Sequence, residues 1–167
     1  RDSSTSRGLG DVYKRQYQNG AAAIGAVSLE PFLGPCRVIH AIDCGPLITP
    51  EHLLHAAANL PPRILVRTAK HAAQEWWTDD FSAYAPQTIE WLAERGVMLI
   101  GLDTPSIDPA SSKTLDSHHT ILRHDMRVLE NLVLDDVPEG DYELIALPLA
   151  LVQADASPVR AVLRELG

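Results

Sequence analysis

Short apolar runs along the chain predict strands, and the segments between them carry helix-starting residues or helical spacing. Pro50, which follows the capping residue Thr49, and Pro86 each predict the first turn of a helix. The first helix is expected to reach about residue 58, and Gly96 is placed to end the second. This alternation predicts an α/β protein with a mostly internal sheet. The predicted strands cover residues 36–42, 63–68, 97–102 and 142–147.

The stretch from residue 101 to residue 140 gathers the residue types that bind metals or move protons. A helix is predicted over residues 117–129, and helical spacing places His118 and Asp125 on its apolar stripe with Leu122 and Leu129. A polar pair on a core-facing stripe needs partners. A metal ion or a buried hydrogen bond to a strand carbonyl would each satisfy it, and the spacing leaves both open.

Glu130 and Asp103 are further candidates at the ends of this stretch. Glu130 follows His118 by twelve residues, which would put the two side chains roughly 120° apart on one unbroken helix. They meet only if the chain leaves the helix near Leu129. Asp103 ends a predicted strand, where ligand sites of α/β proteins gather. It is either part of a site or a carboxylate that caps its own loop with Thr104 and Ser106.

The remaining patterns predict scaffold. His40 lies in an apolar strand and is expected to be half-buried and hydrogen-bonded to the backbone. Ser157 and Pro158 predict the start of a last helix that reaches about residue 166. Three other histidines are expected to face solvent, namely His52, His55 and His71.

Composition narrows the function classes. The 167 residues suit one domain, and 46% hydrophobic with 22% charged residues is a globular composition. A net charge of −8 argues against nucleic-acid binding, and no apolar run approaches the roughly 20 residues that span a membrane. Two cysteines indicate a cytoplasmic protein with reduced thiols, although a Cys36–Cys44 bridge stays open. Without a phosphate loop, a nucleophile elbow or a CxxC pair, metal-assisted hydrolysis or no chemistry remains.

Residues 1–16 differ from the rest of the chain. They read RDSSTSRGLGDVYKRQ, a polar and aperiodic run with no apolar segment of a signal peptide. They resemble translated adaptor or vector sequence, so we expect a non-native leader that is disordered or arbitrarily placed. A single domain is then expected over residues 17–167.

Five segments carry a resemblance to a known family, at residues 20–40, 61–68, 101–119, 129–149 and 155–166. From Tyr17 onward the chain resembles the bacterial kynurenine formamidases (arylformamidases) of the metal-dependent cyclase-like family. The resemblance implies a swivelling β/β/α domain, a homodimer and two divalent metals per subunit, commonly zinc. It also implies a small-molecule substrate, N-formylkynurenine, which is hydrolysed to kynurenine and formate in tryptophan catabolism.

The resemblance assigns site residues one by one. The family's L-D-x-H-H motif and a later Glu provide metal ligands, which match His118 and Glu130. Asp103 and Ser106 then form a wall of the site, and Asp125 becomes a partner behind the ligands or in the core. The family's upstream H-x-G-T-H-x-D-A-P cluster and its general acid/base His have no match in residues 1–16, where Gln16 occupies the place of a His.

These departures imply a domain that is incomplete at its N-terminus and has no catalytic acid/base. Zinc commonly takes at least three protein ligands, and His118 and Glu130 supply two. We therefore expect a formamidase as the full-length parent and little or no activity in this chain. Two alternatives stay open: a cyclase-like amidase or lactonase with another substrate, and a structural or dimerisation fragment that binds no metal.

Overall fold

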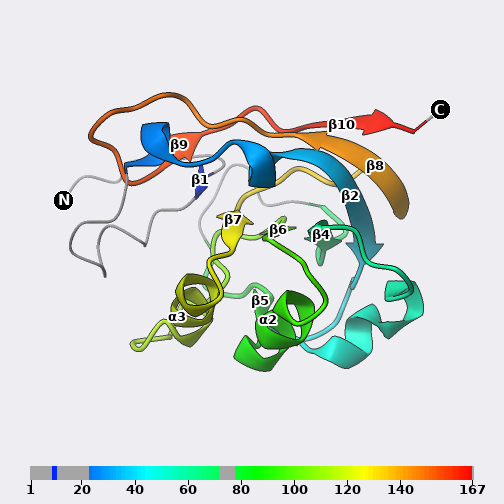
Figure 1. The fold of residues 1–167 in the computed structure, drawn as a ribbon. Coiled ribbons are helices and arrows are strands. Elements are labelled where there is room, and N and C mark those ends of the chain that lie inside the picture. Colours follow the sequence, from blue (N-terminus) through cyan, green and yellow to red (C-terminus); the bar gives the residue numbers. More distant parts are fainter. Residues whose placement is uncertain (1–8, 11–22, 72–77, 167) are drawn as a thin grey trace.

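A six-stranded sheet forms the centre of the protein (Figure 1). The computed structural model describes residues 9–10, 23–71 and 78–166. In spatial order the strands are β10 (Val162–Glu165), β8 (Gly140–Ile145), β2 (Leu33–His40), β4 (Arg63–Arg67), β6 (Leu99–Leu102) and β7 (Arg127–Leu129). The four neighbouring strands β2, β4, β6 and β7 run parallel, whereas β8 pairs antiparallel with both β2 and β10. The predicted α/β class and the four predicted strands are confirmed.

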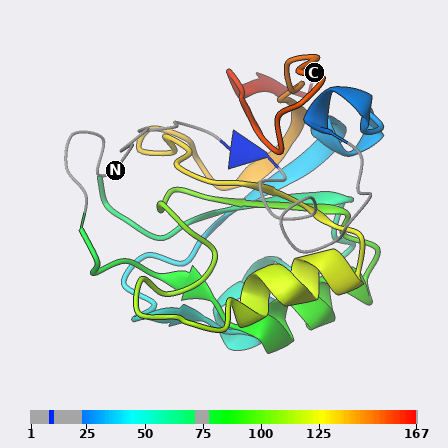
Figure 2. The same cartoon turned by 90° about the vertical axis from the view of Figure 1, so that its left-hand side faces the viewer.

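Helices cover one face of this sheet. Figures 1 and 2 place α2 (Pro86–Ala93) and α3 (Asp116–Arg123) side by side beneath it, with a 3-10 helix, η3 (Pro50–Ala56), beyond α2. Two short 3-10 turns, η1 (Ile24–Ala26) and η2 (Glu30–Phe32), lie on the opposite side of the sheet.

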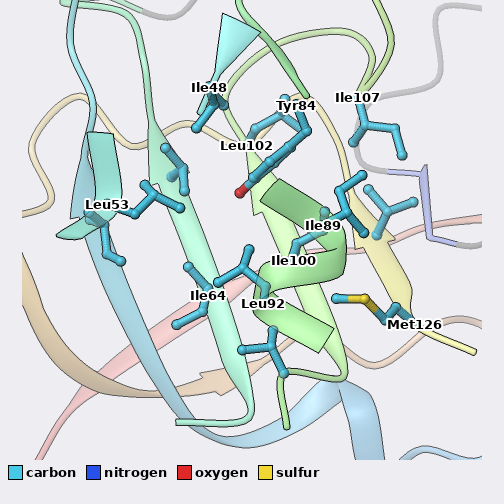
Figure 3. Close-up of a cluster of buried hydrophobic side chains, with 14 of the residues drawn as sticks. Ile48, Leu53, Ile64, Tyr84, Ile89, Leu92, Ile100, Leu102, Ile107 and Met126 are labelled. Carbon is cyan, nitrogen blue, oxygen red and sulfur yellow. The ribbon is translucent and has the colours of Figure 1, made fainter. Parts of the chain in front are cut away.

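The hydrophobic core has two parts, one on each face of the sheet. Side chains alternate between faces along a strand. Ile64 and Val66 of β4 therefore join the cluster between the sheet and α2, while Leu65 joins the cluster on the opposite face. Figure 3 shows the first cluster, in which Ile89 and Leu92 of α2 meet the sheet. Both faces are covered, and all four residues of β6 are buried, as parallel strands require.

Two predicted helix starts are confirmed, with added detail. Thr49 caps η3, and its backbone N–H donates to Nδ1 of His52 at 3.0 Å. His52 is therefore a half-buried capping residue, not the solvent-facing side chain that we expected. The second helix, α2, begins at Pro86, and Gly96 follows it with a positive φ of 81°. Local sequence signals fixed both of these boundaries.

The helix predicted over residues 117–129 is too long. It ends at Arg123, and Asp125 adopts a positive φ of 52° before β7 begins. The reason is tertiary, because residues 127–129 pair in parallel with β6 and so extend the sheet. The side chain of Asp125 is 80% exposed and contacts Arg127 at 3.2 Å. Its expected role in the core or behind the metal ligands is thus wrong.

The last predicted helix is also wrong. Residues 162–165 form β10, which pairs antiparallel with β8, and Ser157–Pro158 form β9. Without β10, one side of β8 would be an open sheet edge, so strand pairing prevails over the helix-starting pattern. β9 pairs with β1 (Leu9–Gly10), so these two residues of the expected leader take part in the fold. The rest of that leader lies outside the described residues.

The environments of His40 and of the two cysteines decide two further expectations. Nε2 of His40 lies 2.9 Å from the carbonyl oxygen of Val137, which confirms a half-buried histidine held by the backbone. Cys36 and Cys44 are both free thiols, so the bridge that was left open is not formed. Within the described ranges, no helix combines the length and the apolar character needed to cross a bilayer.

Candidate metal centre

The candidate site lies where β6 and β7 end. These strands are parallel neighbours, with Gly101 opposite Leu129, so the residues after them leave the sheet at the same edge. β6 leads into the loop of residues 103–108, and β7 leads directly to Glu130. The chain between them contains α3, which returns His118 to this edge. Parallel strand ends are where α/β proteins build their sites.

His118 and Glu130 come together at this edge. Nε2 of His118 lies 3.6 Å from Oε1 of Glu130, and both side chains are buried, at 3% and 4% exposure. Two ligands bound at about 2.1 Å to one tetrahedral zinc ion would lie about 3.4 Å apart. The observed separation exceeds an ordinary hydrogen bond and fits two ligands of one metal ion. The pair therefore has the donor chemistry and the spacing of part of a metal centre.

Asp108 is a functional candidate that the sequence pattern did not single out. Its carboxylate is buried at 3% exposure, and Oδ2 lies 2.5 Å from Nδ1 of His118. The two residues are ten positions apart and belong to a loop and a helix. Asp108 thus contacts the ring nitrogen of His118 that faces away from Glu130. A pairing of this kind has no periodic signature, because it depends on how the loop folds over α3.

The electrostatics of the site favour positive charge. Burial lowers the pKa of His118, but the hydrogen bond that its ring donates to Asp108 and the nearby charges of Glu130 and Asp108 outweigh this effect and raise the pKa above the ordinary 6.5. Burial also raises the pKa of Asp108, yet its bonds with His118 and with the backbone N–H groups of Ser117 and His118 lower it overall. Two buried carboxylates around one imidazole create a field that suits a divalent cation.

The loop of residues 103–108 supports Glu130 as well. The backbone N–H of Ile107 donates to Oε1 of Glu130 at 3.0 Å, and the N–H of Asn131 donates to the carbonyl oxygen of Thr104 at 2.9 Å. Ser106 is half-buried, and its Oγ accepts the N–H of Asp108 at 3.1 Å. Ser106 therefore helps to place Asp108. Its expected role as a wall of the site stays a prediction.

Asp103 anchors a neighbouring loop. Its buried carboxylate accepts the backbone N–H groups of Thr68 and Ala69 at 3.0 Å and the Thr68 hydroxyl at 2.7 Å. These bonds tie the loop after β6 to the chain that follows β4, so the Asp103 carboxylate caps a neighbouring loop and not its own. Asp103 also lines a pocket, so its assignment as a site wall stays a prediction.

This pocket, of about 400 Å³, lies at the ends of β4 and β6. Asp43, Asp103 and Ser82 are among its polar lining residues. Thr104 and Pro105 line it from the same loop that carries Asp108, whereas His118 and Glu130 do not. One loop therefore lines the pocket and also contacts His118 and Glu130.

His118 and Glu130 are the two predicted ligands, and the described part of the chain holds no group of three or more His, Cys, Asp or Glu side chains arranged around a metal position. Asp108 is directed to the far nitrogen of the His118 ring. Gln16, which stands at the expected place of an acid/base His, lies outside the described residues. The incomplete ligand set and the missing acid/base therefore stay predictions.

Fold and site together define an α/β protein with a buried His–Glu pair suited to a divalent metal. The family model Cyclase, described as "Putative cyclase", matches residues 11–109, more than half of the chain. Two curated relatives, from Bordetella petrii and Bordetella pertussis, are each named kynurenine formamidase. Each is 87% identical over 151 residues, which cover 90% of this chain and 72% of the relative. The chain belongs to the kynurenine formamidases of the cyclase family.

Solved structures agree with the fold. One described as a potential metal-dependent hydrolase with cyclase activity superposes with a TM-score of 0.82 at 25% identity. The match covers 96% of this chain and 79% of that chain. The matched range of the family model begins at residue 11, inside the expected leader. The division at residue 17 stays a prediction.

Proposed function

We propose that this chain belongs to a hydrolase that converts N-formylkynurenine to kynurenine and formate. The observation that carries the proposal is the buried His118–Glu130 pair, 3.6 Å apart, in a chain 87% identical to proteins named kynurenine formamidase. Hydrolysis of a formamide requires an activated water and a stabilised carbonyl oxygen. The site described above is built from the residue types that hold a metal for this purpose.

His118 and Glu130 would hold the metal through Nε2 and a carboxylate oxygen. A bound divalent metal supplies Lewis acidity, which activates water and polarises the formyl carbonyl. Zinc is our proposal for its identity, because one imidazole and one carboxylate are ligands that zinc accepts. A second metal of the same subunit would require ligands other than these two.

The ligand number sets the expected activity of the chain. His118 and Glu130 hold a metal ion weakly, since zinc sites commonly use at least three protein ligands. We propose that the 167-residue chain by itself hydrolyses N-formylkynurenine slowly or not at all. Full activity is expected only where further ligands and an acid/base group complete the site.

Formate release tests these proposals. The purified chain and a naturally occurring protein that contains this domain are each assayed with N-formylkynurenine and zinc, with and without a chelator. We expect chelator-sensitive formate release from the larger protein, lost in His118→Ala and kept in His119→Ala, since His119 is exposed on the same helix. No release from the larger protein would contradict the hydrolase proposal. Rapid, chelator-sensitive release by the 167-residue chain would contradict its predicted low activity.

A substrate panel tests the substrate. The panel adds other aryl formamides and a cyclic ester to N-formylkynurenine, at equal concentrations and under one set of conditions. The proposal requires the highest kcat/KM for N-formylkynurenine. A cyclic ester that is hydrolysed faster would favour the lactonase alternative.

A homodimer and a cytoplasmic location complete the proposal. The segment after β8 exposes several large apolar side chains, among them Leu149 at 53% and Val152 at 83%. Exposed apolar groups of this kind favour burial against a second subunit. Two free thiols, Cys36 and Cys44, fit a reducing compartment. Light scattering after size-exclusion chromatography tests the dimer, and a monomer at micromolar concentration would contradict it.

A further inference from the structure

We propose that Asp108 is a positioning residue, which fixes the tautomer and orientation of the His118 ring so that Nε2 faces Glu130. The inference rests on the proposed function in so far as a metal is the group that Nε2 would bind. Its geometric part does not depend on a metal. Asp108 does not contact the metal position, and it acts through His118.

The first step concerns the proton on the ring. An ionised carboxylate can only accept hydrogen bonds, and Oδ2 of Asp108 lies 2.5 Å from Nδ1 of His118. A neutral imidazole in this contact must therefore carry its hydrogen on Nδ1. Nε2 is then left with a lone pair, the form in which histidine binds a metal. A carboxylate on the far nitrogen of a metal-binding histidine also makes the ring more basic.

The second step concerns how firmly the Asp108 carboxylate is held. Oδ1 accepts the backbone N–H of Ser117, and Oδ2 accepts that of His118, both at 3.0 Å. These are N–H groups of the first turn of α3, which have no partner within the helix. Leu115, at the usual capping position, has a left-handed backbone and makes no side-chain capping bond. Asp108 therefore caps α3 from a separate loop, and the same bonds restrain its contact with the ring.

The third step concerns Glu130. The residue before Asp108, Ile107, donates its backbone N–H to Oε1 of Glu130 at 3.0 Å. Two consecutive residues of one loop thus contact both proposed ligands. Asp108 contacts the ring nitrogen of His118 that faces away from Glu130, and Ile107 binds Oε1, the Glu130 oxygen that faces Nε2 of His118. Tyr84 fastens the loop further, since its N–H donates to the carbonyl oxygen of Ile107 at 3.0 Å. This loop therefore helps to hold the two side chains 3.6 Å apart.

A purely structural role for Asp108, as a helix cap alone, makes a different prediction for the ring. We would record long-range ¹H–¹⁵N spectra of the histidine side chains at mildly alkaline pH, where imidazole is neutral. In the unmodified chain, the His118 ring is expected in the Nδ1–H form. In Asp108→Ala, we expect the ring to shift to the Nε2–H form. The matched control is Asp116→Asn, which alters an exposed carboxylate in the first turn of the same helix and should leave the spectrum unchanged.

Asp108→Asn keeps the shape of the side chain and one acceptor oxygen, so we expect partial retention of the Nδ1–H form. This variant also decides the question if Asp108→Ala fails to fold. An Nε2–H ring in the unmodified chain would overturn the inference. So would an Nδ1–H ring that persists at full population in a folded variant at position 108.

Zinc affinity gives the second readout, by calorimetric titration of the same four proteins. Loss of a carboxylate behind a metal-binding histidine typically weakens affinity about 10- to 100-fold. We expect that range for Asp108→Ala, a smaller loss for Asp108→Asn and none for Asp116→Asn. Equal affinities in all four would overturn the positioning role. If the unmodified chain binds no zinc, the metal proposal fails for this chain, while the tautomer measurement still decides the inference.

Discussion

Nε2 of His118 and Oε1 of Glu130 lie 3.6 Å apart, although the local sequence around them does not predict this contact. The chain leaves α3 after Arg123, turns through Asp125 and forms β7 before it reaches Glu130. A continuous helix would have separated the two side chains by roughly 120° around its axis. The pairing of β7 with β6 is therefore what brings Glu130 to His118.

Zinc should stabilise the folded chain through this pair. A ligand that binds only the native state adds about 2–3 kcal/mol when its concentration is a hundredfold above Kd. We expect zinc to raise the melting temperature of the unmodified chain, and a chelator to reverse the rise. Glu130→Gln should abolish the effect, because the amide is a poor zinc ligand, whereas the exposed control His124→Ala should keep it. Equal zinc shifts in Glu130→Gln and the unmodified chain would refute the ligand assignment.

Asp108→Ala should also destabilise the fold without any metal. The variant removes the acceptor of two N–H groups in the first turn of α3, and loss of a helix cap typically costs about 0.5–2 kcal/mol. Urea unfolding in the presence of a chelator measures this loss. Asp116→Asn should change stability by less than about 0.5 kcal/mol, since it is an exposed surface substitution. A folded Asp108→Ala with unchanged stability would show that other groups cap the helix.

Local sequence patterns predict some element boundaries correctly and others wrongly. Thr49, Pro86 and Gly96 mark helix ends through their own backbone chemistry, so these boundaries were predictable. The end of α3 depends on the pairing of β7 with β6. The last segment is a strand, β10, because it pairs with β8. Short-range propensity is overridden by such tertiary contacts.

The candidate site divides in the same way. The family resemblance assigned His118 and Glu130, and the structure brings them together. Asp108 was not singled out from the sequence, because its bond to Nδ1 of His118 follows from loop geometry. The predicted position of Asp125 was wrong because helical spacing was applied beyond Arg123, where α3 ends.

Gly101 should not tolerate a side chain. An added Cβ would lie 2.5 Å from Cδ2 of Leu65 and 2.8 Å from Cδ1 of Leu132, both in the buried core. Overpacking of this kind typically costs about 1–3 kcal/mol. Gly101→Ala is expected to lose this much in urea unfolding, and the added substitution Leu65→Val should recover part of the loss. Fully additive losses in the double variant would show that the clash with Leu65 is not the cause.

Stability should fall in mild acid through Glu139. Partial burial raises its pKa, but the N–H of His40 at 2.6 Å and Nε2 of His55 at 2.8 Å lower it below the ordinary 4.5 overall. A carboxylate whose pKa is depressed by folding stabilises the native state above its unfolded pKa, and this contribution is lost as the pH falls through the folded pKa. Unfolding free energy, measured from neutral pH down to about pH 4 and below, should therefore decline less in Glu139→Gln than in the unmodified chain. Identical pH profiles would contradict the assignment.

The two thiols should differ in reactivity. Burial raises the pKa of Cys36 to about 12, an effect only partly offset by the nearby Arg63. Thiolate is the reactive form, so Cys36 is nearly all unreactive thiol at neutral pH and is also shielded from reagents. Cys44 is half-exposed, and although burial also raises its pKa, reagents can reach it. Iodoacetamide followed by mass spectrometry should label Cys44 first in the native chain and both residues in urea. If Cys36 in the native chain were labelled as fast as Cys44, the sheet around β2 would have to open readily. That result would contradict the buried position of Cys36 in the core.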